Sequence, residues 1–294
     1  MAVASAVLLG VYDAAKKAAV RHNAVPPVLM AAVTIAAIIW AAVLATQRAG
    51  GVSQWPSVLT VSPMTWSMHG LVLVKSVLVG VSWTLAYYAL RRLPLSIAGP
   101  LRAVGPVWTV ALATLVLSER PSATQWVGIA GVLAGFVSLS FVGRREGIRF
   151  TRDPAVALMI LATVVGACSG LYDKWLLGGG NIDVPTLQCW FSIDLVVVIA
   201  PLALHWAWRR RTADPFRWRW SIVAIPLFLL AADFAYFTAL TDPAAMVAAV
   251  SPVRRLATVV SFAIAVTRFG DANPRPKAVC IAVLLAGVVA IGLG

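Results

Sequence analysis

Apolar stretches of about twenty residues recur along the whole length of this chain. Parts of two of them are ALMILATVVGAC, which begins at Ala157, and AVCIAVLLAGVVAIGLG, which begins at Ala278. A membrane-spanning helix needs roughly 20 mostly apolar residues, whereas the strands of a membrane barrel alternate in polarity. These stretches do not alternate. The sequence therefore predicts an all-α integral membrane protein.

The composition is that of a membrane protein, and the net charge is interpreted accordingly. The chain of 294 residues is 61% hydrophobic and 12% charged, and its mean hydropathy is +0.88. Soluble domains are about half apolar and about a quarter charged. The net charge of +13 is typical of basic loops that face anionic lipid. We expect a small-molecule substrate and membrane lipids as partners, and no nucleic acid.

Ten spans fit the hydropathy, and the first is interpreted as a span and not as a removable signal. They cover approximately residues 2–20, 26–46, 66–90, 94–117, 123–143, 154–177, 184–207, 218–240, 243–267 and 273–293. Prolines stand at or near many of the starts, where the missing N–H of proline is harmless. No connection between spans is long enough for a soluble domain.

The second half of the chain repeats the first. GPLRAVGPVWTVALATLVLSE, ending at Glu119, returns as SPVRRLATVVSFAIAVTRFGD, ending at Asp271. At the same offset, Arg102 corresponds to Arg254. Five spans per repeat is an odd number, so the second copy enters the membrane upside down. The sequence predicts two inverted five-helix repeats, residues 1–146 and 152–294, with a central site between them.

The charges of the loops predict an orientation. Basic residues concentrate in the loops after odd-numbered spans and at the adjoining helix ends: Arg21, Arg91, Arg92, Arg144, Arg145, Arg149, Arg152, Arg209, Arg210, Arg211, Arg217, Arg219, Arg268, Arg275 and Lys277. The loops after even-numbered spans hold only Arg48 and Arg120, with Lys174 near a helix end. The positive-inside rule places the odd loops in the cytoplasm and both termini outside it.

The stretch LSERPSATQWVGIAGVLAGFVSL carries a family resemblance. An apolar helix with an acidic residue at its end, then a proline and a glycine-rich span, resembles the EamA-type signature of the drug/metabolite transporter superfamily. The resemblance covers nearly the whole chain, once per half. It implies a ten-helix secondary carrier for amino acids, sugar phosphates, nucleotide sugars, drugs or other metabolites. Asp271 in place of the usual glutamate, the Arg254–Arg255 pair and the outward termini depart from most members.

Arginines inside the spans are the first candidate site residues. Arg102 and Arg254 lie roughly 12 to 16 Å inside their spans at 1.5 Å per residue, near the middle of a ~30 Å core. Arginine stays charged, so each needs an anionic partner or a wet cavity. One interpretation is a clamp for a carboxylate or phosphate, to which Arg255 adds a charge. The other is a structural pair with Asp194, Asp233 or a backbone carbonyl.

Further ionisable residues lie deep in the spans, where charges are costly and mark function. Lys75 either binds substrate or a proton, or it forms a salt bridge to Asp194 or Asp233. Those two aspartates either relay protons or neutralise charge. The basic and acidic residues deep in the spans nearly balance in number. This balance favours a zwitterionic or organic-anion substrate over a lipophilic cation.

A Tyr–Asp pair recurs in the two halves, as Tyr12–Asp13 and Tyr172–Asp173. Asp13 is one turn from lysines at positions 16 and 17, a spacing that brings side chains together on a helix. The pairs are therefore either gates that break and re-form during transport, or static ion pairs at helix ends.

Aromatic residues inside the spans either line a cavity or pack in the bundle. The candidates for lining are Trp83, Tyr87, Trp190 and Tyr236, which offer stacking and a hydrogen-bonding tip. Histidines and cysteines are scattered without metal-ligand spacing, and we expect neither metal nor cofactor.

The leading hypothesis is a secondary active transporter of a small polar metabolite in the cytoplasmic (inner) membrane, as a monomer or homodimer. An amino acid, an organic anion or a phosphorylated metabolite would bind near the midplane and cross by alternating access. The alternative is a drug or lipophilic-cation exporter of the same fold. A membrane-embedded enzyme is less favoured, because the chain has no HExxH or GxSxG motif. A channel or scramblase would share the topology without saturation.

Overall fold

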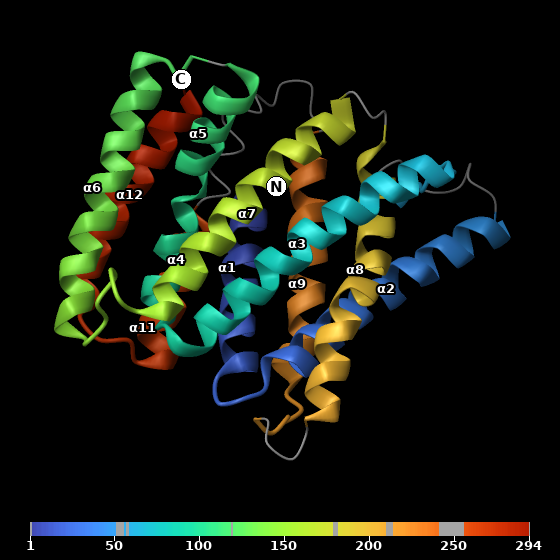
Figure 1. Cartoon of the computed structure of the whole chain (residues 1–294), viewed down its shortest axis with the longest axis horizontal. Coiled ribbons are helices and arrows are strands. Elements are labelled where there is room, and N and C mark those ends of the chain that lie inside the picture. Colours follow the sequence, from blue (N-terminus) through green and yellow to red (C-terminus); the bar gives the residue numbers. More distant parts are fainter. Residues whose placement is uncertain are drawn as a thin grey trace.

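The computed structural model of the chain is a bundle of helices (Figure 1). It describes residues 2–50, 56, 59–118, 120–178, 182–209, 214–240 and 256–293, and this part contains no strand. The helices are α1 (Ala2–Val20), α2 (Val25–Gly50), α3 (Trp66–Arg92), α4 (Leu95–Ala103), α5 (Gly105–Leu117), α6 (Ala123–Arg145), α7 (Pro154–Gly178), α8 (Val184–Trp208), α9 (Trp220–Leu240), α11 (Ala257–Phe269) and α12 (Pro274–Leu293). The prediction of an all-helical protein is confirmed for the described residues.

Most predicted spans coincide with a helix of membrane-crossing length. Seven helical stretches in the described part are long and apolar enough to cross a membrane, namely α2, α3, Leu95–Leu115, α6, α7, α8 and α12. Shorter apolar stretches lie in α9 and α11. The predicted span 243–267 falls partly on residues 241–255, which lie outside the described part. The chain is a multi-pass membrane protein.

The predicted span 94–117 is broken into two helices, which corrects the expectation of one continuous helix. α4 ends at Ala103 and α5 begins at Gly105, with Val104 between them. Pro106 stands in the first turn of α5. A proline ring has no N–H and clashes with the carbonyl four residues before it, so a helix cannot continue through it unchanged. The break leaves Arg102 in the last turn of α4.

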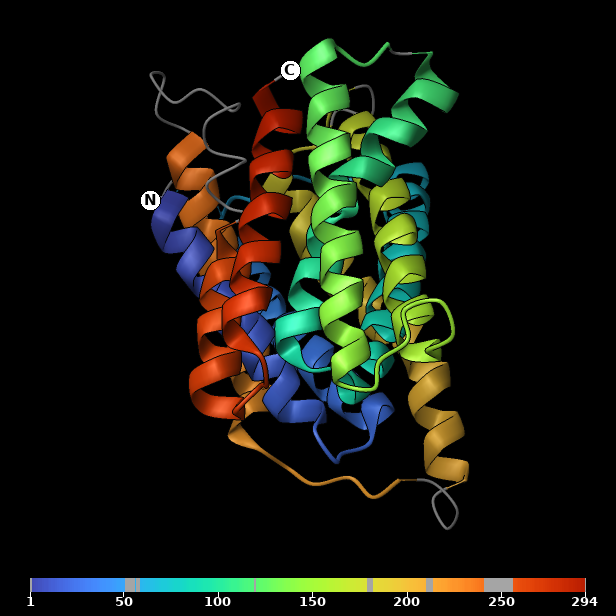
Figure 2. The ribbon, with the colours of Figure 1, turned by 90° about the vertical axis from the view of Figure 1, so that its left-hand side faces the viewer.

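Long helices of the first half pack along helices of the second half. α6 lies along α12, α1 along α9, α3 along α7 and α2 along α8, and Figure 2 shows α6 and α12 side by side. The α6–α12 contact depends on glycine, because a Cβ added at Gly128 would lie 2.7 Å from the Gly287 carbonyl oxygen. Two helix backbones approach this closely only where small residues face each other.

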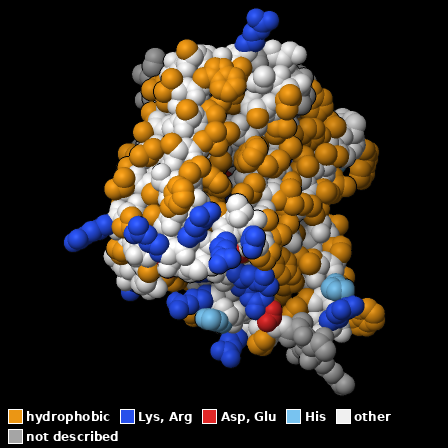
Figure 3. Space-filling model, turned by 60° about the vertical axis from the view of Figure 1, so that its left-hand side comes forward, with side chains coloured by type: hydrophobic (Ala, Val, Ile, Leu, Met, Phe, Trp, Pro, Cys, Tyr) orange, Lys and Arg blue, Asp and Glu red, His pale blue; other side chains and the backbone are white. Residues whose placement is uncertain are grey.

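Basic residues gather at one end of the bundle, which we name the basic end. The connections α1–α2, α3–α4, α6–α7, α8–α9 and α11–α12 lie there (Figure 1). On the face shown in Figure 3, Lys and Arg side chains cluster at this lower end, and hydrophobic side chains cover most of the rest. Hydrogen bonds join its loops, since the Asn23 side chain donates to the Arg217 carbonyl at 2.7 Å and accepts from the Arg217 N–H at 2.8 Å.

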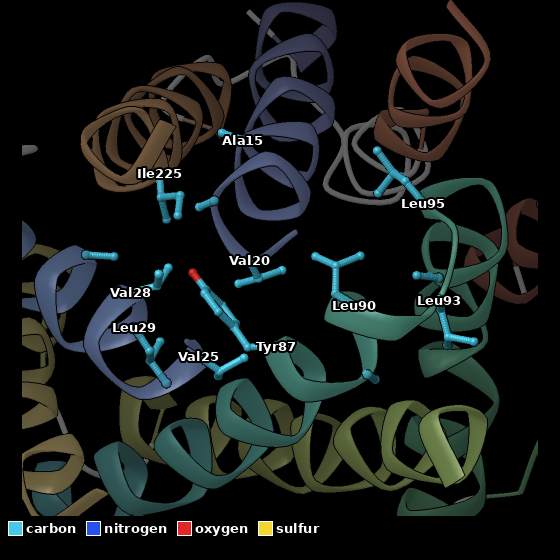
Figure 4. Close-up of a cluster of buried hydrophobic side chains, with 14 of the residues drawn as sticks. Ala15, Val20, Val25, Val28, Leu29, Tyr87, Leu90, Leu93, Leu95 and Ile225 are labelled. Carbon is cyan, nitrogen blue, oxygen red and sulfur yellow. The ribbon is translucent and has the colours of Figure 1, made fainter. Parts of the chain in front are cut away.

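A buried apolar cluster closes the bundle near the basic end (Figure 4). The ends of α1 and α3 and the starts of α2 and α4 contribute to it, with Val20, Val25, Leu93 and Leu95 almost inaccessible to solvent. Close packing holds such side chains together in a membrane protein, where lipid is as apolar as they are. The bundle is thus tightly packed at the basic end, and the candidate site lies deeper, away from it.

Candidate functional site

A cluster of three charged side chains joins α1 to α4. The Asp13 carboxylate accepts a hydrogen bond from the Arg102 guanidinium, in an ion pair, and lies 2.7 Å from the Lys16 ammonium. The Asp13 side chain is 14% exposed. The Lys16 ammonium also lies 3.9 Å from the centroid of the Tyr12 ring, in cation–π geometry. The partner of Arg102 is therefore Asp13, and not Asp194 or Asp233.

A polar cavity of about 340 Å³ opens beside this cluster, between α1, α3, α4, α5 and α7. Its wall contains Tyr12, Lys16, Trp83, Tyr87 and Arg102, with small residues filling the rest of the lining: Ser82, Ala86, Gly105, Thr109, Ala162, Thr163, Gly166, Ala167 and Gly170. Four of the predicted site residues therefore share one cavity wall. The residues that α7 contributes to the wall are all small.

Two cations face one carboxylate at this cavity. Lys16 and Arg102 line it, and Asp13 is the carboxylate that binds both. Gly105 adds the first residue of α5 to the wall, and the N-terminal end of a helix carries a partial positive charge. The described part of the cavity wall therefore carries an excess of positive charge.

Tyr87 contributes to this wall from α3 but directs its hydroxyl elsewhere. Figure 4 shows the side chain pointing into the apolar cluster, with its oxygen near Val28 and Ile225. Within the described part the buried hydroxyl has no hydrogen-bond partner. A buried polar group without a partner costs roughly 1–3 kcal/mol.

A second cavity, of about 250 Å³, lies between α2, α3, α7, α8 and α9. Trp83 lines both cavities. In the second one Lys75 forms an ion pair with Asp173, and its ammonium lies 5.0 Å from the centroid of the Phe191 ring. The partner of Lys75 is therefore Asp173, and not Asp194 or Asp233, although Asp233 lines the same cavity.

The remaining predicted residues lie apart from the two cavities. Trp190 packs edge-on against His69, with ring centroids 4.4 Å apart. Tyr172 donates its hydroxyl to the Leu71 carbonyl at 3.2 Å. Asp194 lines neither cavity, and within the described part its buried Oδ2 has no hydrogen-bond partner.

The side chains of three predicted residues lie outside the part that the structure describes. Arg254 and Arg255 precede the described start of α11, and the side chain of Tyr236 belongs to the stretch of α9 whose side chains are not described. Their predicted roles stay predictions.

Sequence reasoning missed Lys16 and the small residues of α7 as parts of a site. Lys16 was interpreted only as a partner of Asp13, although its spacing from Tyr12 places both on one helix face. Gly166 and Gly170 were not among the predicted site residues. A Cβ at Gly170 would meet nothing within 4 Å, because this glycine faces the polar cavity. The described residues contain no group of three or more His, Cys, Asp or Glu that could hold a metal ion.

A network of polar side chains closes the basic end below the polar cavity. The Lys277 ammonium is fully buried, lies 2.8 Å from the Glu146 carboxylate and donates to the Ser96 hydroxyl at 2.9 Å. The Asp271 carboxylate accepts a hydrogen bond from the Ser96 backbone N–H at 2.9 Å. These contacts join the ends of α6 and α11 to the starts of α4 and α12, and we name them the basic-end latch.

Comparison with known proteins identifies the family of the first half. Residues 1–141 match the EamA-like transporter family. The resemblance of its sequence to EamA-type proteins of the drug/metabolite transporter superfamily is thereby confirmed.

Two other comparisons found similar proteins. An uncharacterized protein of Methanocaldococcus jannaschii is 40% identical over 68 residues, which make up 23% of this chain and 50% of that protein. The chain thus spans about half the length of this curated relative. A protein of known crystal structure is 19% identical, with a TM-score of 0.59 over 99% of this chain and 95% of that chain. At this identity the likeness shows a shared fold alone.

Proposed function

We propose that the protein is a secondary active transporter of a small polar anion, such as an organic acid or a phosphorylated metabolite. The observation that carries the proposal is the polar cavity, where the cations of Lys16 and Arg102 share the single carboxylate of Asp13. Removing charge from water is costly, and an uncompensated cation inside a membrane protein is stabilised by an anionic ligand. Arginine also binds carboxylate and phosphate oxygens in a planar fork.

The helix contacts support a chain built from two inverted five-helix repeats. The symmetry of such a chain exchanges its two halves. If the first helix of one half packs on the third span of the other, the same contact therefore recurs with the halves exchanged. α1 packs on α9, the third span of the second half, and α3 packs on α7, the first helix of that half. α2–α8 and α6–α12 join equivalent spans. Inverted repeats place the substrate site at their interface, where α7 meets α1, α3, α4 and α5 in the polar cavity.

Alternating access is supported by the difference between the two ends of the bundle. The basic end is closed by the apolar cluster and by the basic-end latch. A carrier of this kind exposes its site to one side at a time by rocking one repeat against the other. We infer that the basic end is cytoplasmic, following the loop charges, and that the structure corresponds to the state closed toward the cytoplasm.

Uptake into proteoliposomes tests the function. A stabilisation screen of the purified protein against amino acids, organic acids and sugar phosphates first identifies a ligand, and its radiolabelled form is then supplied across a pH or charge gradient. We expect saturable uptake that depends on the gradient. Uptake that rises linearly with substrate concentration would contradict a carrier and indicate a channel.

Arg102 variants test the binding site. We expect Arg102→Gln to reduce uptake at least about tenfold, since a charge-assisted pair is worth roughly 1.5–3 kcal/mol, and Arg102→Lys to retain part of it. Arg48→Gln is the matched control, because it removes the same charge from an exposed position outside both cavities. Size-exclusion profiles and melting temperatures establish that each variant folds. Undiminished uptake by folded Arg102→Gln would overturn the proposed anion site.

A further inference from the structure

The described end of the connection between α8 and α9, residues 214–219, crosses the basic end without helical turns, and we name it the strap. In Figure 2 it runs, in orange, below the ends of the helices. Its backbone is bonded to the turn between α1 and α2. The Ala24 N–H donates to the Pro215 carbonyl at 3.3 Å, and the Asn23 side chain binds both the N–H and the carbonyl of Arg217. Backbone atoms therefore hold the strap in place.

Aromatic and basic side chains alternate from the strap into α9, where the sequence reads FRWRW from Phe216 to Trp220. The three aromatic side chains are exposed, from 36% at Phe216 to 80% at Trp220. Arg219 donates to the Ala18 carbonyl at the end of α1 at 2.5 Å and so stabilises the fold. The Arg217 side chain is exposed. Exposed aromatic rings beside an arginine are typical of a segment that lies among lipid headgroups.

Two more exposed arginines lie in segments that are bonded to the strap. Arg21 belongs to the turn between α1 and α2 that holds it. Arg92, at the end of α3, follows the Arg91 whose guanidinium pairs with Asp214 of the strap. Arg21, Arg92 and Arg217 thus come from three parts of the chain to one region of the basic end.

Carboxylates leave the positive charge of this region in excess. Asp214 is the one acid of the strap, and it already pairs with Arg91. The other acids in the described connections of the basic end bind partners elsewhere in the protein, namely Glu146 with Lys277, Asp153 with the Ala155 N–H and Asp271 with the Ser96 N–H. The exposed arginines around the strap therefore favour an anionic partner.

The opposite end of the bundle shows which feature is particular to the strap. Trp66, at the start of α3, is 92% exposed there, so an exposed tryptophan occurs at both ends, as the two interfaces of a membrane require. The arginines are unevenly distributed, since the described connections of the opposite end contain only Arg120, and Arg48 lies at the end of α2. Arginine binds phosphate oxygens in a planar fork. A phospholipid with net negative charge offers this phosphate without a cation of its own.

We propose that the strap, with Arg21, Arg92 and Arg217, binds the headgroup of an anionic phospholipid from the adjoining leaflet. The guanidinium groups bind the lipid phosphate, and the rings of Trp218 and Trp220 lie at the level of the headgroup. This site is separate from the polar cavity and does not depend on the proposed transport. Lipid binding and transport can therefore fail experimentally one without the other.

Native mass spectrometry of the purified full chain tests the proposal. The protein in detergent is titrated with dioleoylphosphatidylglycerol, which is anionic, or with dioleoylphosphatidylcholine, which has the same acyl chains and no net charge. We expect the first anionic lipid to bind at least about tenfold more tightly, which corresponds to 1.4 kcal/mol. Equal affinities would overturn the proposal. Glycerol 3-phosphate supplies the phosphate without acyl chains, and displacement of the lipid by an equal concentration of it would show a site for soluble anions instead.

Variants with matched loss of charge locate the bound lipid. Arg21→Gln combined with Arg217→Gln is expected to weaken binding of the anionic lipid roughly twentyfold, since each arginine near a membrane surface contributes about a fivefold factor. Arg48→Gln combined with Arg120→Gln removes the same charge from exposed positions at the opposite end and is expected to leave the affinity unchanged. Equal losses in the two double variants would show attraction by net charge alone and refute the site.

An uncharged substitution keeps the test decisive if the arginine variant fails to fold. Trp218→Leu removes an exposed ring of the strap and is expected to weaken binding of the anionic lipid several-fold. Size-exclusion profiles establish that each variant folds. Unchanged affinity in folded Trp218→Leu, or in the folded Arg21 and Arg217 double variant, would exclude the strap as the binding site.

Discussion

The Tyr–Asp pair of α1 and the Tyr–Asp pair of α7 have the same sequence and different surroundings. Asp13 is 14% exposed and binds two cations, Lys16 and Arg102. Asp173 is 31% exposed and pairs with Lys75. Tyr12 is buried beneath the Lys16 ammonium, whereas Tyr172 stacks on Trp175 with ring centroids 5.6 Å apart.

The difference follows from the position of each pair along the bundle. α1 runs toward the basic end and α7 runs away from it (Figure 1). Asp13 therefore lies beside the closed apolar cluster, and Asp173 lies toward the opposite end. In a carrier with inverted repeats, the two pairs would exchange surroundings when the carrier changes state. The same motif thus holds a more enclosed carboxylate in α1 than in α7.

The largest expected effect is on stability, when the two carboxylates are neutralised in turn. Asp13→Asn leaves Lys16 and Arg102 side by side without their shared anion, and breaking a buried pair costs roughly 3–5 kcal/mol. We expect Asp173→Asn to cost less than half of this, because Asp173 is more exposed and loses fewer partners. Thermal unfolding in detergent measures both changes.

A double variant shows whether the loss of stability in Asp13→Asn comes from unpaired charge or from altered packing. Asp13→Asn combined with Lys16→Met removes one cation together with the carboxylate, and we expect it to recover part of the lost stability. Equal melting temperatures for Asp13→Asn and Asp173→Asn would show that the two pairs are equivalent after all.

Breaking the basic-end latch is expected to have the next largest effect, on the accessibility of the closed end. Lys277→Met leaves the Glu146 carboxylate without its buried cation. We expect the buried thiol of Cys280, one turn along α12, to react with N-ethylmaleimide roughly tenfold faster, since 1.4 kcal/mol changes an opening equilibrium by a factor of ten. Mass spectrometry of the modified peptides measures the rate.

Cys189 is the internal control for the labelling experiment. It is buried in α8, in a separate cluster with Trp40 and Val61, and its reaction rate should not change. Parallel acceleration at both cysteines would indicate general loosening of the protein instead of opening at the basic end.

A smaller effect is expected from the tyrosines. Tyr12→Leu removes the ring that the Lys16 ammonium contacts, and a desolvated cation–π contact is worth up to about 2 kcal/mol. Tyr172→Phe removes only the hydrogen bond to Leu71, worth about 0.5–1.5 kcal/mol. Unfolding temperatures should rank the variants in this order. Tyr12→Phe retains the ring and should resemble the unchanged protein, so a large loss in that variant would assign the effect to the hydroxyl.

The smallest effect is expected from a third carboxylate, at the surface of the basic end. The hydrogen bond from the Arg91 guanidinium lowers the pKa of Asp214, which lies in the α8–α9 connection. A carboxyl with a lowered pKa in the folded state stabilises the protein above its unfolded pKa of about 4, and this contribution is lost as pH falls through the folded pKa. Melting curves of the protein and of Arg91→Gln should therefore differ slightly at pH 6 and converge near pH 3. If the melting temperatures of the protein and of Arg91→Gln still differ near pH 3, the Arg91–Asp214 pair is not the cause of the difference.

The helical class and most spans were predictable from the sequence because hydropathy is a local property. The break between α4 and α5 was not predicted, although Gly105–Pro106 stands at the place where it occurs. Apolar composition alone does not distinguish one long helix from two helices that meet at a proline.

The sequence predicted several residues of the polar cavity but not the ion pairs that they form. Tyr12, Trp83, Tyr87 and Arg102 do share a cavity, but Arg102 pairs with a carboxylate from a helix 89 residues away. Such a partner depends on how helices pack, and hydropathy carries no information about that. Trp190 could not be separated from cavity residues, because an aromatic in a span looks the same in the sequence whether it packs or lines a cavity.

The hydrogen bond from the Ser96 N–H to Asp271 links the folding of a helix to the closure of the protein. α4 begins after Pro94, whose side chain offers no oxygen to the first turn, and the acceptor comes from beyond the end of α11. A motion that separated α4 from Asp271 would leave the start of α4 without this acceptor and fray its first turn. Separating α4 from Asp271 would therefore cost the protein a hydrogen bond at the start of a helix as well as a contact between two helices.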